Sequence, residues 1–223
     1  DVTWNPNANS SVNFLIISNN SIYIGGWFTS VGGLSRNRIA KLNNTTGAAD
    51  PSWNVVFSTS YFLGISVLDS KVFIYGDVVL LDNTVLRNRL AKVNYKTGEI
   101  DPTWNPNANN SVTAVEICGS DIYIGGDFTS VGGVTRNHAA KLNKTTGAVD
   151  PTWNPNANNY LTVIKCIGSD VYVGGWFSSI GGLSRNNIAK LNNTTGAADP
   201  AWNPNANNEV SAMLFDGDDL YIG

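Results

Sequence analysis

The chain has 223 residues and a net charge of −3, and only 14% of its residues are charged. Soluble domains usually carry roughly 25% charged residues, so we expect a polar but mostly neutral surface, as on many secreted proteins. With this weak negative charge, we expect no positively charged surface that would bind nucleic acid or an anionic membrane. No apolar run approaches the roughly 20 residues that span a bilayer, and the chain begins at Asp1 without a leader. We therefore predict an extracellular or cell-surface protein, without membrane insertion, whose signal sequence has been removed.

A unit of about fifty residues recurs along the chain and is clearest at residues 104–153. Its opening Trp-Asn pair recurs at steps of 49, 51, 49 and 49 residues, and an Arg-Asn pair repeats independently at steps of 51, 49 and 49. Such self-similarity indicates a repeat architecture. We name repeat 1 (residues 5–53), repeat 2 (54–104), repeat 3 (105–153), repeat 4 (154–202) and a partial repeat 5 (203–223), with residues 1–4 ending a preceding repeat.

Each complete repeat predicts four short strands. In repeat 1, the sequence NPNA predicts a type I turn, and two apolar runs around a Ser-Asn turn predict a hairpin. A glycine loop, a third strand and a tight turn follow, and Pro51 places the fourth strand at the sheet edge. The predicted strands are residues 12–17, 22–24, 39–42 and 49–54, and the loop is residues 27–35. We predict an all-β β-propeller of four-stranded antiparallel blades, four complete and a partial fifth.

Repeat 2 departs from the others because its loops are apolar. Residues 55–59 replace the NPNAN sequence, and residues 75–82 replace the glycine loop. Two explanations are open: these loops face a neighbouring molecule, or the repeat has drifted. The chain ends also leave two alternatives. Residues 1–5 would join residues 209–223 to close a five-bladed ring, or the chain is an excerpt of a longer propeller, which the interruption of a strong repeat favours.

The recurring string IYIGGxFTSVGGxxRNxxAKLN, followed by TTGAxDPTWNP, resembles the bacterial delta-sixty type β-propeller repeat. Repeat 2 and the Trp before Asn-Pro depart from that pattern, but the resemblance covers nearly the whole chain. It implies a propeller within a large secreted or surface-attached protein, with a scaffold or adhesive role and no active-site residues to carry over. In repeat 1 the matching positions are Gly25-Gly26, Phe28, Gly32-Gly33, Arg36-Asn37, residues 40–43 and Asp50, and equivalents recur in repeats 3 and 4.

The repeated arginines allow a functional and an architectural interpretation. As a ring of cations they would bind a ligand. As structural groups, each would use its fork of donors to pair with the repeated aspartate and tie strands or blades together. A feature present in every repeat favours the architectural interpretation. The residues concerned are Arg36, Arg87, Arg136 and Arg185, with Asp50, Asp101, Asp150 and Asp199.

The tryptophans divide into two groups. Those of the Trp-Asn pairs, Trp53, Trp104, Trp153 and Trp202, are sugar-stacking platforms or, as we favour, fill the gap between blades. Trp27 and Trp176 stand beside the glycine loop, where other repeats carry Asp77 and Asp127. This variable position is our candidate for ligand contact.

The Asp- and Asn-rich turns raise two further possibilities. DPTWNPNAN and residues 216–219 would supply oxygen ligands to Ca²⁺, although neither matches a calcium-loop spacing and Asx turns explain both. Asn-x-Ser/Thr sequons are candidates for glycosylation. The sequon asparagines are Asn9, Asn19, Asn43, Asn44, Asn109, Asn143, Asn192 and Asn193.

Cys118 and Cys166 lie on first strands of neighbouring repeats, 14 and 13 residues after their tryptophans. They would bond across the gap or point apart, and two free buried thiols is the plainer expectation. His138 is the only histidine, and we predict a solvated turn residue.

No Ser/His/Asp set, metal-spaced histidine cluster or phosphate-binding glycine loop occurs in the sequence. We predict a protein without enzyme activity or cofactor: an extracellular structural or adhesive scaffold, including the case of a repeating subunit of a surface layer or filament. The alternative is a lectin-like propeller with one shallow site per blade. The expected partners are other surface proteins, copies of itself, or glycans.

Overall fold

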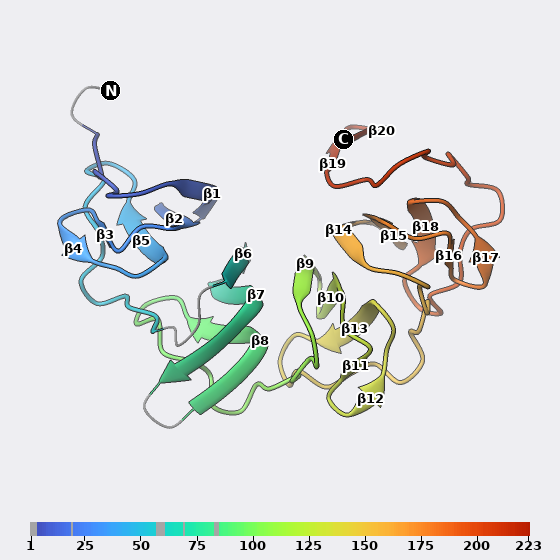
Figure 1. Ribbon diagram of the computed structural model, residues 1–223, viewed down its shortest axis with the longest axis horizontal. Helices are drawn as coiled ribbons and strands as arrows, with labels where there is room; N and C mark the ends of the chain where they lie inside the picture. The colour runs from blue at the N-terminus through green and yellow to red at the C-terminus, as the bar shows by residue number, and fades with distance from the viewer. Residues whose placement is uncertain (1–3, 19, 57–60, 69, 83–84) are drawn as a thin grey trace. The chain divides into compact units, whose positions relative to one another are not determined.

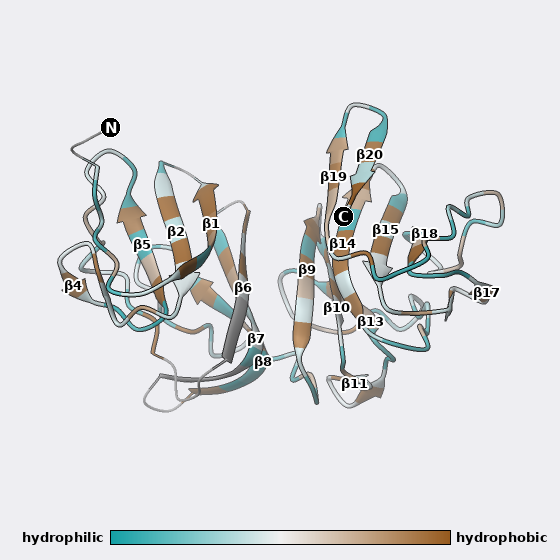
Figure 2. Ribbon diagram, turned by 45° about the horizontal axis from the view of Figure 1, so that its top comes forward, coloured by the Kyte–Doolittle hydropathy of each residue, from teal (hydrophilic) through white to brown (hydrophobic). Residues whose placement is uncertain are grey.

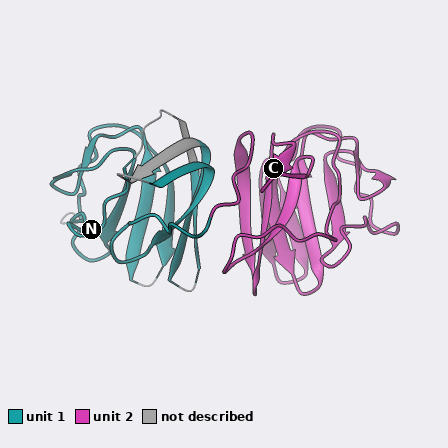
Figure 3. Cartoon of the chain, turned by 90° about the horizontal axis from the view of Figure 1, so that it is seen from below, with its two compact units in different colours: residues 1–104 teal, residues 105–223 magenta. Residues whose placement is uncertain are grey.

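The structure is a computed structural model that describes residues 4–18, 20–56, 61–68, 70–82 and 85–223. Within that part of the chain every regular element is a β-strand, and none is a helix (Figure 1). No described segment therefore forms a helix capable of crossing a bilayer. Two compact units divide the chain at Trp104 (Figure 3). Residues 1–104 hold repeats 1 and 2, and residues 105–223 hold the others; of the predicted preceding repeat, residues 1–3 lie outside the described residues.

Each complete repeat forms one three-stranded antiparallel sheet. In repeat 1 the order is β1-β2-β5, from β1 (Val12–Ser18), β2 (Ser21–Gly26) and β5 (Ile39–Asn43). The predicted glycine loop contains a further small hairpin, β3 (Ser30–Val31) with β4 (Leu34–Ser35). In repeat 2 the sheet is β6 (Tyr61–Leu68), β7 (Lys71–Asp82) and β8 (Val85–Asn94).

The second unit repeats the arrangement. Repeat 3 comprises β9 (Val112–Cys118), β10 (Asp121–Gly126) and β13 (Ala139–Asn143), with the small hairpin β11 (Ser130–Val131) and β12 (Val134–Thr135). Repeat 4 comprises β14 (Leu161–Ile167), β15 (Asp170–Gly175) and β18 (Ile188–Asn192), with the small hairpin β16 (Ser179–Ile180) and β17 (Leu183–Ser184). The partial repeat 5 is the hairpin β19 (Met213–Asp216) and β20 (Asp219–Ile222).

The predicted fourth strand is wrong as a strand. Residues 49–54 meet the third strand only through an isolated bridge between Ala49 and Leu42, and each of the other complete repeats has one such bridge. The backbone N–H of Asp50 still bonds to Lys41 O, at 2.8 Å. Pro51 then has no N–H to offer, and the Asp50 carboxylate accepts the N–H of Ser52, which turns the chain away from the sheet. Each sheet therefore has three strands and one bridged edge residue.

Two backbone features explain the repeated sequence locally. The glycine that ends the second strand in repeats 1, 3 and 4, at positions 26, 126 and 175, lies against a neighbouring backbone, and a Cβ on Gly26 would overlap the carbonyl oxygen of Ser11. The residue before the third strand of repeats 1, 3 and 4 is left-handed although none is glycine: Arg38, His138 and Asn187 have φ of 69°, 63° and 63°. The equivalent residue of repeat 2, Arg89, lies within β8 and has φ of 66°. Repeat 2 differs, because β7 and β8 extend through the region of the small hairpin as one long pair.

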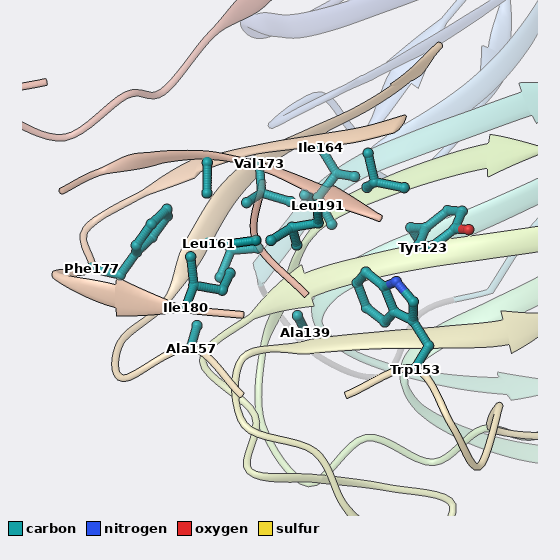
Figure 4. Close-up of a cluster of buried hydrophobic side chains, with 14 residues drawn as sticks. Tyr123, Ala139, Trp153, Ala157, Leu161, Ile164, Val173, Phe177, Ile180 and Leu191 are labelled. Atoms are coloured by element: carbon teal, nitrogen blue, oxygen red, sulfur yellow. The ribbon is translucent and has the colours of Figure 1, made fainter. Parts of the chain in front are cut away.

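Hydrophobic residues concentrate on the strands and polar residues in the turns (Figure 2). In the second unit, one buried cluster joins repeats 3 and 4 (Figure 4). Trp153 and Tyr123 lie together at one end of that cluster, and Leu161, Ile164 and Phe177 extend it through repeat 4 (Figure 4). Successive repeats within the unit therefore share a core.

Candidate functional site

The four repeated arginines are buried and bind backbone. The terminal guanidinium nitrogen of Arg36 donates to the carbonyl oxygens of Asp50 and Pro51, at 2.8 and 3.2 Å. The guanidinium therefore reaches the repeated aspartate through its backbone carbonyl and not through its carboxylate, and it ties the segment before the third strand to the turn that follows that strand. The equivalent distances to the carbonyl oxygens of Asp101, Asp150 and Asp199 are 2.9 Å from Arg87, 2.7 Å from Arg136 and 2.8 Å from Arg185.

The aspartate carboxylates pair with lysine instead. Lys41 Nζ lies 2.9 Å from Asp50, and Lys92 Nζ lies 2.7 Å from Asp101. The pairs in the second unit are Lys141 with Asp150 at 3.5 Å and Lys190 with Asp199 at 3.3 Å. Burial opposes the ionisation of Asp101, but hydrogen bonds from Lys92 and Thr103 outweigh it and lower the pKa to about 2. Cavities of about 330 and 400 Å³ lie beside the first two pairs, whose charges are already matched.

Two of the repeated tryptophans, Trp53 and Trp153, lie between successive repeats of one unit. Trp53 is fully buried, meets Tyr23 of repeat 1 edge-on, and donates its Nε1 hydrogen to Asn94 O of repeat 2 at 3.1 Å. Trp153 does the same with Tyr123 and Asn192 O at 3.0 Å. Such rings serve packing rather than ligand contact. Trp104 and Trp202 meet Phe73 and Tyr172 edge-on, with ring centroids 5.3 and 5.4 Å apart.

The sequon asparagines also serve the fold. Asn9 accepts the N–H groups of Thr29 and Ser30 and donates Nδ2 to Thr29 Oγ1, so it anchors the small hairpin, as Asn109 and Asn158 do in repeats 3 and 4. Sequence reasoning missed this anchor, although the fixed spacing of 20 residues from the asparagine to Thr29, Thr129 or Ser178 was a usable signal. Asn43, Asn143 and Asn192 cap their turns by accepting two N–H groups each. Asn44 donates to Asn20 Oδ1, Asn193 Oδ1 accepts from Thr194, and Asn19 lies outside the described residues.

No group of three or more His, Cys, Asp or Glu side chains arranged to hold a metal occurs among the described residues. In the predicted acidic turn, Asp216 and Asp219 are partners across the β19–β20 hairpin. His138 places its Nδ1 atom 3.0 Å from Gly126 O and is partly buried.

Cys118 and Cys166 form a disulfide, so the expectation of free thiols is wrong. Their Cα atoms are 6.4 Å apart, one at the end of β9 and the other on β14. These first strands of repeats 3 and 4 lie side by side, as the bond from Thr113 Oγ1 to Leu161 O also shows. The bond therefore joins two repeats across the gap between them.

The variable position after the Gly-Gly pair has a different neighbourhood in each repeat. Trp27 lies under the Arg38 guanidinium, with 4.9 Å from Cζ to the ring centroid. Asp77 forms an ion pair with Arg89. Asp127 accepts a hydrogen bond of 2.9 Å from Asn110 Nδ2. Trp176 instead lines an open cleft of about 280 Å³, together with Asn158, Asn159, Phe177, Ser178, Asn186, Asn187 and Asn207.

Three segments of the chain match the family described as "Domain of unknown function (DUF5122) beta-propeller". They are residues 17–52, 121–152 and 170–201, which fall in repeats 1, 3 and 4. With the all-β sheets above, this match supports β-propeller repeats in repeats 1, 3 and 4.

Two solved structures of computationally designed proteins are similar in fold. The Ika8 protein has a TM-score of 0.55 and 12% identity over 96% of this chain and 68% of its own. The Ika4 protein has a TM-score of 0.51 and 12% identity over 82% of this chain and 92% of its own. Identities this low inform the fold alone. No curated protein matches the chain.

Proposed function

We propose that this protein is a non-catalytic structural or adhesive scaffold outside the cell, built from β-propeller repeats of the delta-sixty type. Each complete repeat would be one blade, giving four complete blades and a partial fifth. The observation that carries the proposal is the use of the repeated polar residues. The repeated arginine, lysine, aspartate and asparagine side chains bind the blade's own backbone or one another. These contacts support a structural role for the repeated polar residues.

The disulfide supports the location. Disulfides persist in oxidising environments and are rare in the cytosol, and here one joins two repeats. The low charge of the chain agrees with a neutral secreted surface. Neighbouring surface proteins or further copies of the chain would be the partners.

Two measurements test the proposal on the native protein. A membrane-impermeant amine label applied to intact cells should modify its lysines, and material released from the surface should form regular filaments or layers in electron micrographs. Protein that stays unlabelled until the cells are broken, and that is a monomer by light scattering, would contradict the proposal.

A lectin-like module is the second candidate, and one observation favours it. In repeat 4 an exposed tryptophan after the Gly-Gly pair lines a cleft. The other repeats carry an ion pair, an arginine over the ring or an Asp–Asn hydrogen bond at that position. This favours a single site rather than one per blade.

A further inference from the structure

We propose that the cleft beside Trp176 binds a neutral carbohydrate, with the indole as the platform for one sugar ring. The inference deepens the lectin-like candidate and rests on it, and it does not depend on the scaffold proposal because it uses only the side chains of repeats 4 and 5. It assigns a ligand class to the loop of repeat 4 that follows Gly174-Gly175.

The platform is accessible, and the backbone that carries it is held. Trp176 is 47% exposed, whereas its neighbour Phe177 is only 4% exposed and belongs to the core of the second unit. The backbone N–H of Trp176 donates to Tyr160 O at 3.0 Å. An indole presents a flat apolar surface and has only two side-chain torsions to order when a ligand binds. The C–H face of a pyranose is a matching surface.

The rim of the cleft is made of amides whose orientations are fixed. Asn186 Nδ2 donates to Asn205 Oδ1 at 2.8 Å, and Asn187 Nδ2 donates to Ala206 O at 2.9 Å, so the Oδ1 atom of each remains an acceptor. Asn159 Oδ1 accepts the N–H of Tyr160, and no group in the described part of the chain accepts from its Nδ2. Acceptors and a donor thus stand around one ring, as the hydroxyl groups of a sugar require.

Charge and size restrict the ligand further. The side chains that line the cleft include no Asp, Glu, Lys, Arg or His, so nothing there would pair with a phosphate, a uronate or an ammonium group. The volume of about 280 Å³ lies at the lower limit of ligand pockets, roughly 300–1,000 Å³. The cleft therefore suits one sugar residue or the end of a glycan chain.

Repeats 1 and 3 are natural controls. In repeat 1 the Arg38 guanidinium lies over the Trp27 ring, so a cation already occupies a face of the platform. In repeat 3 there is no ring, and Asp127 takes the Asn110 Nδ2 hydrogen that Asn159 leaves unused in repeat 4. The substitution Trp176→Asp would recreate the repeat 3 arrangement with a residue that this backbone position already accepts.

The test is an NMR titration of the full chain with the methyl glycosides of glucose, galactose, mannose and N-acetylglucosamine, and with glucuronate and sialic acid as charged controls. We expect at least one of them to shift the Trp176 indole resonance in a saturable way and to leave that of Trp27 in place. Trp176→Asp should weaken this binding at least tenfold, and Trp27→Ala should leave it within twofold, with the thermal transitions of both variants recorded to show that they fold.

Three results would overturn the proposal. The first is no saturable shift with any of the four glycosides. The second is equal binding by folded Trp176→Asp. The third is a response confined to glucuronate or sialic acid, because the uncharged rim gives no reason for it. None of these results bears on the surface location or assembly that tests the scaffold.

Discussion

The junction between repeats 1 and 2 and the junction between repeats 3 and 4 share one device. A tryptophan from the end of one repeat packs edge-on against an aromatic ring of its own repeat and donates its indole hydrogen to the next. Trp53 and Trp153 fill these roles, with hydrogen bonds of 3.1 and 3.0 Å. Because two distinct units of the chain use the same contact, it belongs to the architecture of the repeat.

The two junctions differ in what is added to that contact. Between repeats 3 and 4 there are a disulfide and an ion pair of 3.2 Å from Lys165 to Glu116. By the register of the hairpins, Ile16 and Ser66 occupy the ion-pair positions between repeats 1 and 2. Burial raises the pKa of Glu116, and Lys165 opposes that shift. The second unit thus adds a disulfide and an ion pair to the tryptophan contact that both units share. Four experiments distinguish the shared contacts from the added ones.

Removing the shared tryptophan should have the largest effect. Truncating a buried Trp to Ala costs about 3–5 kcal/mol of unfolding free energy, so Trp153→Ala and Trp53→Ala should each destabilise their own unit by that amount. Hydrogen exchange of peptides from β2 and β7 and from β10 and β15 measures both. Trp176→Ala, at an exposed ring, is the matched control and should change neither. Unchanged exchange in Trp153→Ala would mean that the indole does not join the repeats.

Removing the disulfide should have the second-largest effect, and it should destabilise the second unit only. Cross-linking a loop of this length contributes about 2–4 kcal/mol, so Cys118→Ser with Cys166→Ser should speed hydrogen exchange in β9 and β14. Peptides from β1 and β6 should exchange as before, since the first unit has no cysteine. Equal acceleration in both units would show that the bond is not a local reinforcement.

Replacing a repeated arginine tests the contacts to backbone. Lysine keeps the charge of Arg136 but cannot reproduce the planar fork that reaches Thr135 O, Asp150 O and Pro151 O. Hydrogen bonds of charged groups contribute about 1.5–3 kcal/mol, and we expect Arg136→Lys to lose about that much in a urea titration. Arg38→Lys, which retains a cation beside Trp27, should lose less than about 0.5 kcal/mol. A loss for Arg136→Lys as small as that for Arg38→Lys would show that the charge, and not the planar geometry, of Arg136 matters.

The smallest effect should appear only in acid. The folded-state pKa of Asp101 is about 2, against 3.8 for the ordinary side chain. A lowered folded pKa means that this stabilisation is complete above about pH 4 and is lost as the pH falls toward 2. Asp101→Asn should therefore flatten the fall of the urea midpoint over that interval, and Lys92→Met should act in the same direction. A wild-type midpoint that does not change over this interval would contradict the pKa assignment.

The fold was largely predictable from the sequence because each strand and turn recurs in several repeats, so that each one is predicted independently several times. The first three strands follow from apolar runs and turns that recur at a fixed period. The fourth strand failed because alternation around Ala49 resembles a strand, whereas Pro51 and the Asp50 turn end the pairing after one bridge. Strand propensity alone does not show at which residue the backbone N–H groups stop pairing with the neighbouring strand.

The site was predictable in position but not in contacts. Sequence comparison between the repeats singled out Trp27 and Trp176 as departures. The structure places Trp176 at an uncharged cleft and Trp27 under the Arg38 guanidinium. Each arginine was expected to pair with an aspartate because opposite charges attract, but the hydrogen bonds go to backbone carbonyl oxygens. The cysteines required knowledge of how neighbouring strands are aligned, since a shift of one residue turns a side chain to the other face.

The most direct test of the account is a disulfide map of the native protein, isolated with its thiols blocked at the moment of lysis. The account predicts a cross-linked peptide containing Cys118 and Cys166, because β9 and β14 are adjacent and the proposed extracellular location is an oxidising environment. Recovery of both cysteines as blocked thiols would contradict the covalent joining of repeats 3 and 4 and the extracellular location together.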